Sequence, residues 1–383
     1  MEFVDFKIKE IAKVTAGGDK PKIVSNSYSN ETPIPIYSNG MENDGLYGYT
    51  NIPKVDADTV TISARGVNVG KVCYRETAFL PIVRLLSLIP NRSVINAKYM
   101  YYNLKMMNIS GTGSAQPQIT VPMISELKMH IHKDLIEQEK IASFLSVLDE
   151  KIKNNNRINR NLLEQLDALY DNWFGKYKPF NIGIGGDPGY ALEDGWQIRD
   201  IYSIAEVIYG APFTSKKFNT EGKGKPIVRI RDLKNQELCT YTPEEHPKGY
   251  LLQPGDIVVG MDGEFRPYIW GNEEAWLNQR VCVFNNVRKN GKAYVYCTIK
   301  PLLYSVETTE VATTVIHIGK KDYDEFRVVL PPEDILVEFE AVSKPIFDRI
   351  VEGQLENRRL TKLRNGLLPK LMSGELDVSY LNV

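Results

Sequence analysis

The sequence predicts an α+β protein with two globular β-rich domains separated by two long α-helices that form an antiparallel coiled coil. Three observations support this prediction. Residues 135–175 carry an apolar seam at helical spacing, a second seam follows 198 residues later (Ile350 against Ile152), and the segments ahead of the two seams resemble each other more weakly. One unit of about 190 residues therefore occurs twice, and this predicts an internal pseudo-two-fold repeat.

The bulk composition is that of a globular chain. It has 383 residues, 43% hydrophobic and 25% charged, which is long enough for two or three cores. The formal net charge of −1 argues against a histone-like polyanion binder. There is no apolar run of membrane-spanning length, and residues 1–5 lack the features of a signal peptide, so we expect a cytoplasmic protein without a membrane partner. The four cysteines lack ligand spacing and are expected to be reduced thiols: Cys73, Cys239, Cys282 and Cys297.

The first seam alternates steps of four and three residues, as a coiled coil requires. Its members are Ile141, Leu145, Leu148, Ile152, Asn155, Asn159, Leu162, Leu166, Leu169 and Trp173. The second seam is less regular, with Ser343, Gly353 and Arg364 at core positions, and its apolar and amide members are Phe339, Ile346, Ile350, Asn357, Leu360, Leu367 and Leu371. Pro345 is expected in a first turn or at a kink, and Pro369 at a fraying end.

Each seam has a polar middle, and this suggests how the helices pair. Two similar units in one chain commonly relate by a pseudo-two-fold axis, which makes their helices antiparallel. Aligning polar with polar then places Asn155 against Asn357 and Asn159 against Gly353. Buried amides at such positions cost stability but fix the register. The alternative is an ordinary amphipathic helix of a bundle with both asparagines facing water.

The repeat also extends ahead of the seams. Residues 6–18 resemble residues 196–211, with Phe6 aligned to Trp196 and Ile8 to Ile198; after a gap of three residues Gly17 aligns with Gly210. Together these patterns predict a first domain at 1–134, a long helix at 135–175, a Gly-rich linker at 176–191, a second domain at 192–332 and a C-terminal helix with its tail at 333–383.

Short β-rich runs broken by turn residues fill both predicted domains. They cover residues 59–74, 79–90, 225–233, 255–265, 280–287 and 293–299. Helices are expected to be fewer, with residues 97–107 as the clearest example.

Sequence motifs for catalysis are missing. Residues 66–72 are one residue short of a phosphate-binding loop, residues 183–186 lack the flanking strand and helix of a nucleotide fingerprint, and Pro331-Pro332 lacks the flanking residues of an amino-methyltransferase signature. A nuclease-like cluster of Asp256, Asp262 and Glu264 is more simply a set of turn acids. His130 and His132 alternate on an expected strand without a third metal ligand nearby. We therefore predict a protein without catalytic or metal-binding residues.

Several loops carry side chains that suit DNA, since Arg pairs with guanine, Asn and Gln with adenine, and Lys with phosphate. The alternative for each residue is a structural role, as a turn or capping residue on a solvated surface. The candidates in the first domain are Lys20, Lys22, Asn39, Asn43, Tyr47, Arg65, Asn68, Lys71, Ser114, Gln116 and Gln118. Those in the second are Thr214, Ser215, Lys216, Lys217, Arg229, Arg231, Asp262, Glu264, Arg266, Asn278, Gln279 and Arg280.

Taken together, these features resemble the DNA specificity subunits of type I restriction-modification systems. The resemblance covers essentially the whole chain and is carried by the doubled order of domain and helix and by the segments 110–120, 136–152, 192–218 and 365–376. The sequence departs from the family pattern at Phe6, where Trp is usual, and at 307–318, which replaces a Gly-Thr-Gly-Ser form.

The resemblance implies a non-catalytic clamp on double-stranded DNA. Each domain would read one half of an asymmetric, interrupted site, while the helices would act as spacer and dock two adenine-N6 methyltransferase subunits. Restriction and translocase subunits would join them. The chain itself would hold no cofactor, because S-adenosylmethionine, ATP and magnesium would be bound by the partner subunits. A coiled-coil scaffold with protein-binding ends is the alternative function, and an enzyme with an unrecognised site is the third possibility.

Overall fold

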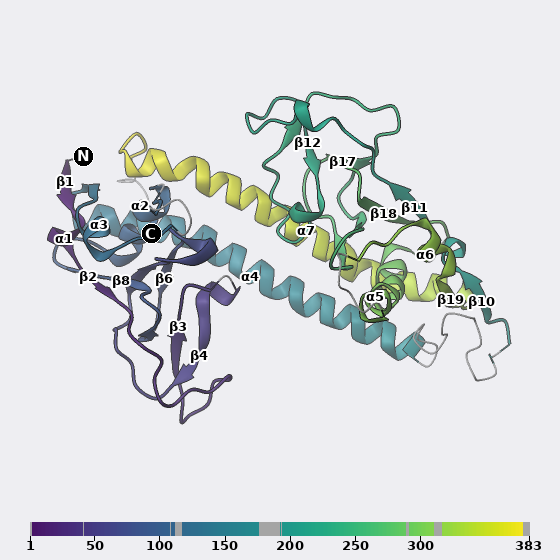
Figure 1. The fold of residues 1–383 in the computed structure, drawn as a ribbon, viewed down its shortest axis with the longest axis horizontal. Helices are drawn as coiled ribbons and strands as arrows, with labels where there is room; N and C mark the ends of the chain where they lie inside the picture. The colour runs from purple at the N-terminus through teal and green to yellow at the C-terminus, as the bar shows by residue number, and fades with distance from the viewer. Residues whose placement is uncertain are drawn as a thin grey trace. The chain divides into compact units, whose positions relative to one another are not determined.

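The computed structural model describes residues 2–40, 42–107, 109–111, 117–175, 192, 194–288, 291–309 and 316–377. The chain forms two compact units, which are described separately below (Figure 1). Unit 1 comprises Met1–Glu150 with Leu360–Val383, and unit 2 comprises Lys151–Arg359. The predicted linker at 176–191 lies outside the described residues.

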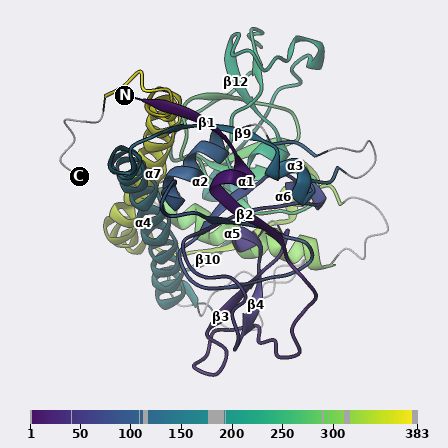
Figure 2. The same ribbon diagram turned by 90° about the vertical axis from the view of Figure 1, so that its left-hand side faces the viewer.

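Unit 1 contains three small sheets, which we call, with their loops, the first head. The outer pair joins β1 to β9, the main sheet has the order β2-β8-β5-β6, and a smaller sheet, with the order β4-β3-β7, projects from it (Figure 2). Its strands are β1 (Phe3–Lys7), β2 (Ala12–Ala16), β3 (Ile34–Tyr37), β4 (Leu46–Thr50), β5 (Thr59–Ile62), β6 (Val72–Arg75), β7 (Leu80–Pro81), β8 (Leu86–Pro90) and β9 (Lys128–His132).

Unit 2 repeats this topology in the second head. Its outer pair is β10-β19, its main sheet has the order β11-β18-β15-β16, and its smaller sheet has the order β13-β12-β17-β14. The strands are β10 (Gln197–Asp200), β11 (Ala205–Tyr209), β12 (Lys225–Val228), β13 (Tyr241–Thr242), β14 (Leu251–Leu252), β15 (Ile257–Gly260), β16 (Pro267–Ile269), β17 (Ala275–Leu277), β18 (Val281–Asn286) and β19 (Arg327–Leu330). The parallel pairs β3–β7 and β12–β17 also correspond, so the predicted repeat is confirmed at the level of strand order.

The start of the repeat was aligned wrongly from the sequence. The amide of Ile8 donates to the Leu127 carbonyl at 3.0 Å, and the amide of Ile201 donates to the Phe326 carbonyl at 3.2 Å. These equivalent bonds place Ile8 with Ile201, not with Ile198, at the same offset of 193 that relates Gly17 to Gly210. The predicted three-residue gap therefore does not exist. The apolar residues of the two segments are spaced so similarly that an alignment shifted by three residues also matches.

Helices occupy more of the chain than the sequence suggested. They are α1 (Ile8–Ile11), α2 (Ala97–Met106), α3 (Val121–Ser125), α4 (Leu135–Phe174), α5 (Gly291–Thr309), α6 (Lys320–Glu325) and α7 (Glu333–Met372), with short 3-10 turns η1 (Glu42–Gly45), η2 (Gly66–Asn68), η5 (Ile201–Ser203), η6 (Ser215–Lys217) and η7 (Ile230–Asp232). In the part of the chain that the structure describes, none of these helices combines the length and apolar character needed to cross a bilayer.

The strand predicted at 293–299 is wrong, since these residues belong to α5. Their aromatic and branched side chains favour strands intrinsically, but such preferences are weak where burial decides the structure. Tyr294, Val295, Cys297 and Ile299 all lie in the core of unit 2, and a helix buried on most sides has no amphipathic pattern to reveal it.

Within unit 2, segments of α4 and α7 lie side by side and antiparallel. Asn155 donates through Nδ2 to Oδ1 of Asn357 at 3.0 Å and to Glu356 at 2.7 Å, and a Cβ on Gly353 would lie 2.5 Å from Oδ1 of Asn159. The polar positions therefore meet in the register expected from the sequence. Asn155 is 1% exposed, so the alternative in which the asparagines face water is wrong.

Aromatic packing continues this arrangement towards the second head. The ring of Phe174 lies 4.9 Å from that of Phe339 and 5.1 Å from that of Tyr294, and Tyr170 completes the cluster. Phe174 is at the end of α4, Phe339 near the start of α7, and Tyr294 in α5. The core of the second head thus includes side chains from both long helices.

Unit 1 contains the other ends of both helices, again antiparallel. Ile141 and Leu145 of α4 share the core of the first head with Leu368 and Leu371 of α7, and nearer the middle of each helix Arg364 forms an ion pair with Asp149. Every residue of both predicted seams is buried or half-buried. The first-turn alternative for Pro345 is wrong, because α7 begins at Glu333 and runs through it.

The amide pair in unit 2 gives a first prediction. Asn155→Leu should lower the free energy of unfolding by about 1 to 3 kcal/mol, because the Oδ1 of Asn357 and the carboxylate of Glu356 lose their donor. The double variant Asn155→Leu with Asn357→Leu should recover much of this loss, since apolar pairs replace buried polar ones at little cost. Urea unfolding measures both. A single variant as stable as the wild type would show that this hydrogen bond contributes nothing.

Candidate nucleic-acid interface

One loop of each head is built in the same way. In the first head residues 63–71 connect β5 to β6, and in the second head residues 261–266 connect β15 to β16; we call these the hairpin loops. Ile119 donates its amide to the Ala64 carbonyl, and Ile318 donates its amide to the Met261 carbonyl, both at 3.0 Å. Arg65, which follows Ala64, is therefore the structural equivalent of Asp262, and Gln118 that of His317.

In each hairpin loop, the residue after Arg65 or Asp262 is a glycine. Gly66 has φ +79° and Gly263 has φ +81°, a left-handed backbone that other residues rarely adopt. A Cβ on either would meet nothing within 4 Å, so both glycines border open space. The residues just before them, Arg65 and Asp262, thus lie at the open edge of each hairpin, where a long ligand can approach.

In the first head, Asn39 joins this loop to its neighbour. Its Nδ2 donates to the Val83 carbonyl at 2.7 Å, and its Oδ1 accepts from the amide of Ala64 at 2.8 Å. Asn39 is thus half-buried and holds two loops together, which is a structural role for a predicted base-reading residue. Its effect is to place Arg65 beside the turn after β7.

An ion pair covers the other side of the same hairpin. Lys71 lies 2.9 Å from Asp44, which follows Asn43 in a turn where both residues have a left-handed backbone. Burial alone would raise the pKa of Asp44, but the hydrogen bond and charge of Lys71 hold it below its ordinary value. Lys71 is therefore partly neutralised, and Asn43 is an exposed turn residue next to the pair.

The remaining first-head candidates are spread more widely. Lys20 lies over the ring of Tyr47, 4.3 Å from its centroid, and Lys22 is exposed two residues further on. Gln118 is half-buried against the hairpin, and the buried Nδ2 of Asn68 has no hydrogen-bond partner among the described residues. Ser114 and Gln116 lie outside the described residues.

In the second head, an acidic and basic cluster occupies the equivalent hairpin. Oδ1 of Asp262 lies 2.6 Å from Nδ1 of His317 and 3.8 Å from the guanidinium of Arg280. The amide of Met261 donates to the Arg280 carbonyl at 2.9 Å, so the hairpin loop and the turn before β18 are joined directly. Here no inserted amide side chain like that of Asn39 is needed.

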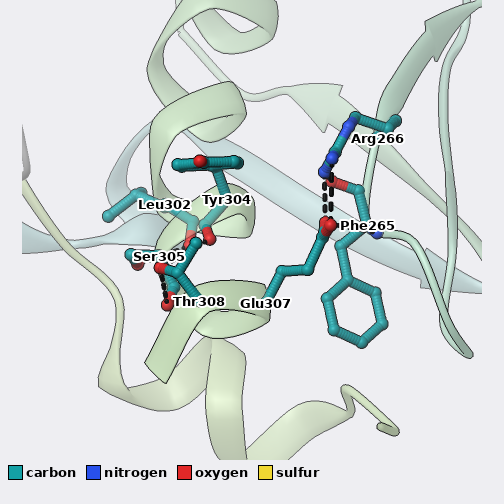
Figure 3. A network of polar contacts seen from close by, with 7 residues as sticks. All are labelled: Phe265, Arg266, Leu302, Tyr304, Ser305, Glu307 and Thr308. Atoms are coloured by element: carbon teal, nitrogen blue, oxygen red, sulfur yellow. Dashed lines mark hydrogen bonds and ion pairs between the residues drawn. The ribbon is translucent and has the colours of Figure 1, made fainter. Parts of the chain in front are cut away.

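Two predicted arginines of the second head are occupied by contacts within the head. Arg229 donates to both carboxylate oxygens of Asp232 and to the hydroxyl of Thr240. Arg266 forms a bidentate pair with Glu307 of α5, which Figure 3 shows from close by. A contact to DNA by either would require breaking these bonds. The sequence could not reveal the pair of Arg266, because its partner is 41 residues away, whereas Asp232 is only three residues from Arg229.

The other second-head candidates differ in exposure and in whether their side chains are already hydrogen-bonded or ion-paired within the head. The backbone amide and hydroxyl of Thr214 donate to Glu244, which also pairs with Lys217 at 3.6 Å. Asn278 is buried, with an Oδ1 that has no partner among the described residues. Exposed side chains remain at Ser215, Lys216, Arg231, Glu264 and Gln279.

The Arg266–Glu307 pair gives a pH prediction. The hydrogen bond from Arg266 holds the pKa of Glu307 below its ordinary value of 4.5, so this carboxylate stabilises the fold above that pH and the contribution is lost as pH falls through the lowered pKa. Glu307→Gln should therefore destabilise unit 2 most near neutral pH, with the difference from wild type shrinking in acid. Urea midpoints at pH 7 and at steps below pH 4.5 test this; a pH-independent difference would contradict it.

Sequence reasoning missed Arg84. It is exposed in the turn between β7 and β8, and we find no hydrogen bond or ion pair for its guanidinium within the described part of the chain, although its backbone amide donates to the Gly17 carbonyl at 3.1 Å. The turn lies beside the hairpin loop through Asn39. The signal was present in the repeat, because Arg84 aligns with Arg280, a residue that was predicted, at an offset of 196.

No group of three or more metal-ligating side chains is found within the described residues. Both histidines of β9 instead contact Phe3, with ring centroids 4.9 Å apart for His130 and 5.1 Å for His132. All four cysteines are free thiols, as expected from their spacing.

The two heads share one topology, and each packs against antiparallel segments of the two long helices. The protein thus belongs to a class with an internal repeat in which each head carries exposed polar loops. The chain belongs to the family of type I restriction-modification DNA specificity proteins, since the model described as "Type I restriction modification DNA specificity domain" matches residues 1–164 and again 193–351. The predicted family is thereby confirmed.

Particular relatives agree with this assignment. The chain is 26% identical to the type I restriction enzyme MjaIX specificity subunit of Methanocaldococcus jannaschii, over 98% of this chain and 94% of that protein. It is 29% identical to the EcoBI specificity subunit of Escherichia coli, over 49% of this chain and 40% of that protein. The crystal structure of a type I S subunit from M. genitalium has the same fold, with a TM-score of 0.60 and 17% identity over 97% of this chain and 96% of that one.

Proposed function

We propose that this protein selects the DNA sequence for a type I restriction-modification complex, with each head reading one half of an asymmetric, interrupted site in double-stranded DNA. The observation that carries the proposal is the chemical difference between the hairpin loops. Arg65 and Gln118 of the first head are replaced, at equivalent positions, by Asp262 and His317 in the second. Two heads with one scaffold and opposite charges at the same place suit two different half-sites.

The hydrogen-bonding groups of the bases in the major groove explain why the two hairpin loops would select different bases. Arg donates two hydrogen bonds to guanine O6 and N7, Gln pairs with adenine, and a carboxylate accepts from the amino group of cytosine. A guanidinium and a carboxylate at equivalent positions therefore favour different bases. The exposed lysines, such as Lys22 and Lys216, suit phosphate, which positions the protein without reading sequence.

The long helices have two roles in the proposed recognition of DNA. We propose that α4 and α7 set the unread gap between the half-sites and that their outer faces dock two adenine-N6 methyltransferase subunits. The hydrogen-bonded amides of Asn155, which is buried, and Asn357, which is half-buried, support a fixed spacer, because they specify one register of the pair. Restriction and translocase subunits complete the complex. S-adenosylmethionine, ATP and magnesium are bound by these partners, and this chain carries no catalytic residue.

Methylation mapping tests the proposed function. The full chain is co-expressed with adenine-N6 methyltransferase subunits of a type I system, and modified adenines are mapped by sequencing the host DNA. The expected result is methylation at a sequence with two different halves around an unspecified gap, and none without this chain. Methylation that does not depend on the chain, or a site with a single uninterrupted element, would contradict the proposal.

A further inference from the structure

In both heads, the turn that leads into β8 or β18 of the main sheet has a residue with a left-handed backbone at the same position. Arg84, ahead of β8, has φ +60°, and Arg280, ahead of β18, has φ +68°. We call residues 81–85 and 277–281 the arginine turns. Left-handed conformations are uncommon for residues other than Gly, Asn and Asp, and cost roughly 1 to 2 kcal/mol.

Equivalent hydrogen bonds show that the two turns correspond residue for residue. The Gly17 amide donates to the Leu85 carbonyl at 2.8 Å, as the Gly210 amide does to the Val281 carbonyl at 2.9 Å. The next bonds also match, since Val83 donates to the Gly18 carbonyl at 2.9 Å and Gln279 to the Ala211 carbonyl at 2.8 Å. Arg84 and Arg280 therefore occupy the same position of the fold.

The arginine is the one residue that these turns share. The sequences are Pro-Ile-Val-Arg-Leu in the first head and Leu-Asn-Gln-Arg-Val in the second, so residues 81–85 match 277–281 only at the arginine. Glycine would adopt this backbone at lower cost. A strained backbone that holds a non-glycine residue at the same place in two diverged heads indicates that the side chain is required.

The side chain is not required for packing. Both arginines are exposed, and the side chain of Arg280 is 57% exposed with Asp262 at 3.8 Å as its acidic neighbour. Both turns are fixed beside a hairpin loop, through Asn39 in the first head and through the Met261 amide in the second. Each arginine is therefore exposed, and can bind a ligand, next to the residues that differ between the heads.

We propose that Arg84 and Arg280 are sequence-independent phosphate contacts, one in each head, that hold the DNA backbone while the hairpin loops read the bases. This inference rests on the proposed function. It divides the interface into a constant part, which is the same guanidinium in both heads, and a variable part, which is Arg65 with Gln118 in one head and Asp262 with His317 in the other. Phosphate contacts fix the position of a protein on DNA but carry no sequence information.

The salt dependence of binding tests this division. The full chain in complex with its methyltransferase partners binds a duplex selected from a randomised library by the wild-type complex, and a shuffled duplex, over a range of salt concentrations. Arg84→Gly and Arg280→Gly should each reduce the slope of log K against log salt by about 0.9, and the double variant by about twice that. The ratio of affinities for the two duplexes should stay the same.

Two control variants separate charge from backbone strain. Val83 also has a left-handed backbone, at φ +53°, so Val83→Gly relieves strain in the same turn while keeping Arg84, and its slope should equal that of the wild type. Arg84→Lys should restore most of the slope lost in Arg84→Gly, because it restores the charge. Thermal unfolding of each variant confirms that the head is folded.

The outcomes distinguish this inference from the proposed function. Unchanged slopes in both glycine variants would overturn the phosphate assignment, and so would a loss of preference for the selected duplex, which would make the arginines base-reading residues. If the wild-type complex binds the selected and shuffled duplexes equally, the proposed function fails instead.

Discussion

Exchanging residues 1–134 for the first head of a relative with a different target is expected to change one half of the recognised DNA sequence and to leave the other half and the gap unchanged. The reason is that the two heads have separate cores. Arg65 and Gln118 depart with the first head, whereas Asp262 and His317 stay. Each mismatched base pair costs about 1 to 3 kcal/mol, so several changed pairs should lower methylation of the original site by orders of magnitude.

The exchange has a structural requirement and a reciprocal control. The first head packs Tyr102 against Asp149 of α4 through a 2.8 Å hydrogen bond, and its core includes Ile141 and Leu145, so the donor head must present compatible residues to α4. Exchanging residues 192–332 instead should change only the other half. Methylated adenines are mapped for both chimaeras. If either exchange altered both halves of the site, the assignment of one half-site to each head would be wrong.

Gly17→Ala and Gly210→Ala should each destabilise the head that contains them by about 2 to 3 kcal/mol. An added Cβ at Gly17 would lie 2.7 Å from the carbonyl carbon of Pro81, and one at Gly210 would lie 2.0 Å from the carbonyl oxygen of Asn278. Both atoms belong to the backbone of an arginine turn and cannot rotate away. The turn must move, and its hydrogen bonds to Gly17 and Gly18, or to Gly210 and Ala211, lengthen.

Calorimetry of the full chain measures the loss as a lower melting temperature for one of the two units. Gly366→Ala is the control, because a Cβ there meets nothing within 4 Å and alanine favours the helix, so this variant should be as stable as the wild type or more so. Since Gly17 and Gly366 both lie in unit 1, they can be compared directly. Equal melting temperatures for Gly17→Ala and Gly366→Ala would show that the arginine turn tolerates displacement.

The sequence was most informative where apolar residues recur with a fixed period. The seam of α4 predicted a helix over 135–175, and the structure has it from Leu135 to Phe174. The alignment of Asn155 with Asn357 also followed from the sequence, because buried polar groups must meet partners. Where a helix is buried on most of its sides, its apolar residues no longer recur with the helical period. The residues of α5 were predicted to form a strand for this reason.

The recognition loops could be listed from composition, but their roles could not be assigned. Arg229, Arg266 and Asn39 looked like base-reading residues, yet each is bonded within its head, to Asp232, Glu307 and the loop backbone respectively. Arg84, in contrast, was passed over within an apolar run although it is exposed. Loop side chains have no periodicity, so their direction depends on the particular contacts of each residue, many of which are distant in sequence.

By itself, then, the sequence determined the doubled organisation, the two long helices and their register, and the family, since all of these depend on local periodicity and on similarity between the halves of one chain. The tertiary structure alone decided which loop residues share a surface, that Arg65 corresponds to Asp262, and that Arg84 and Arg280 occupy one strained position. These facts depend on hydrogen bonds between segments far apart in the chain, such as that from Ile119 to Ala64, and no local pattern encodes them.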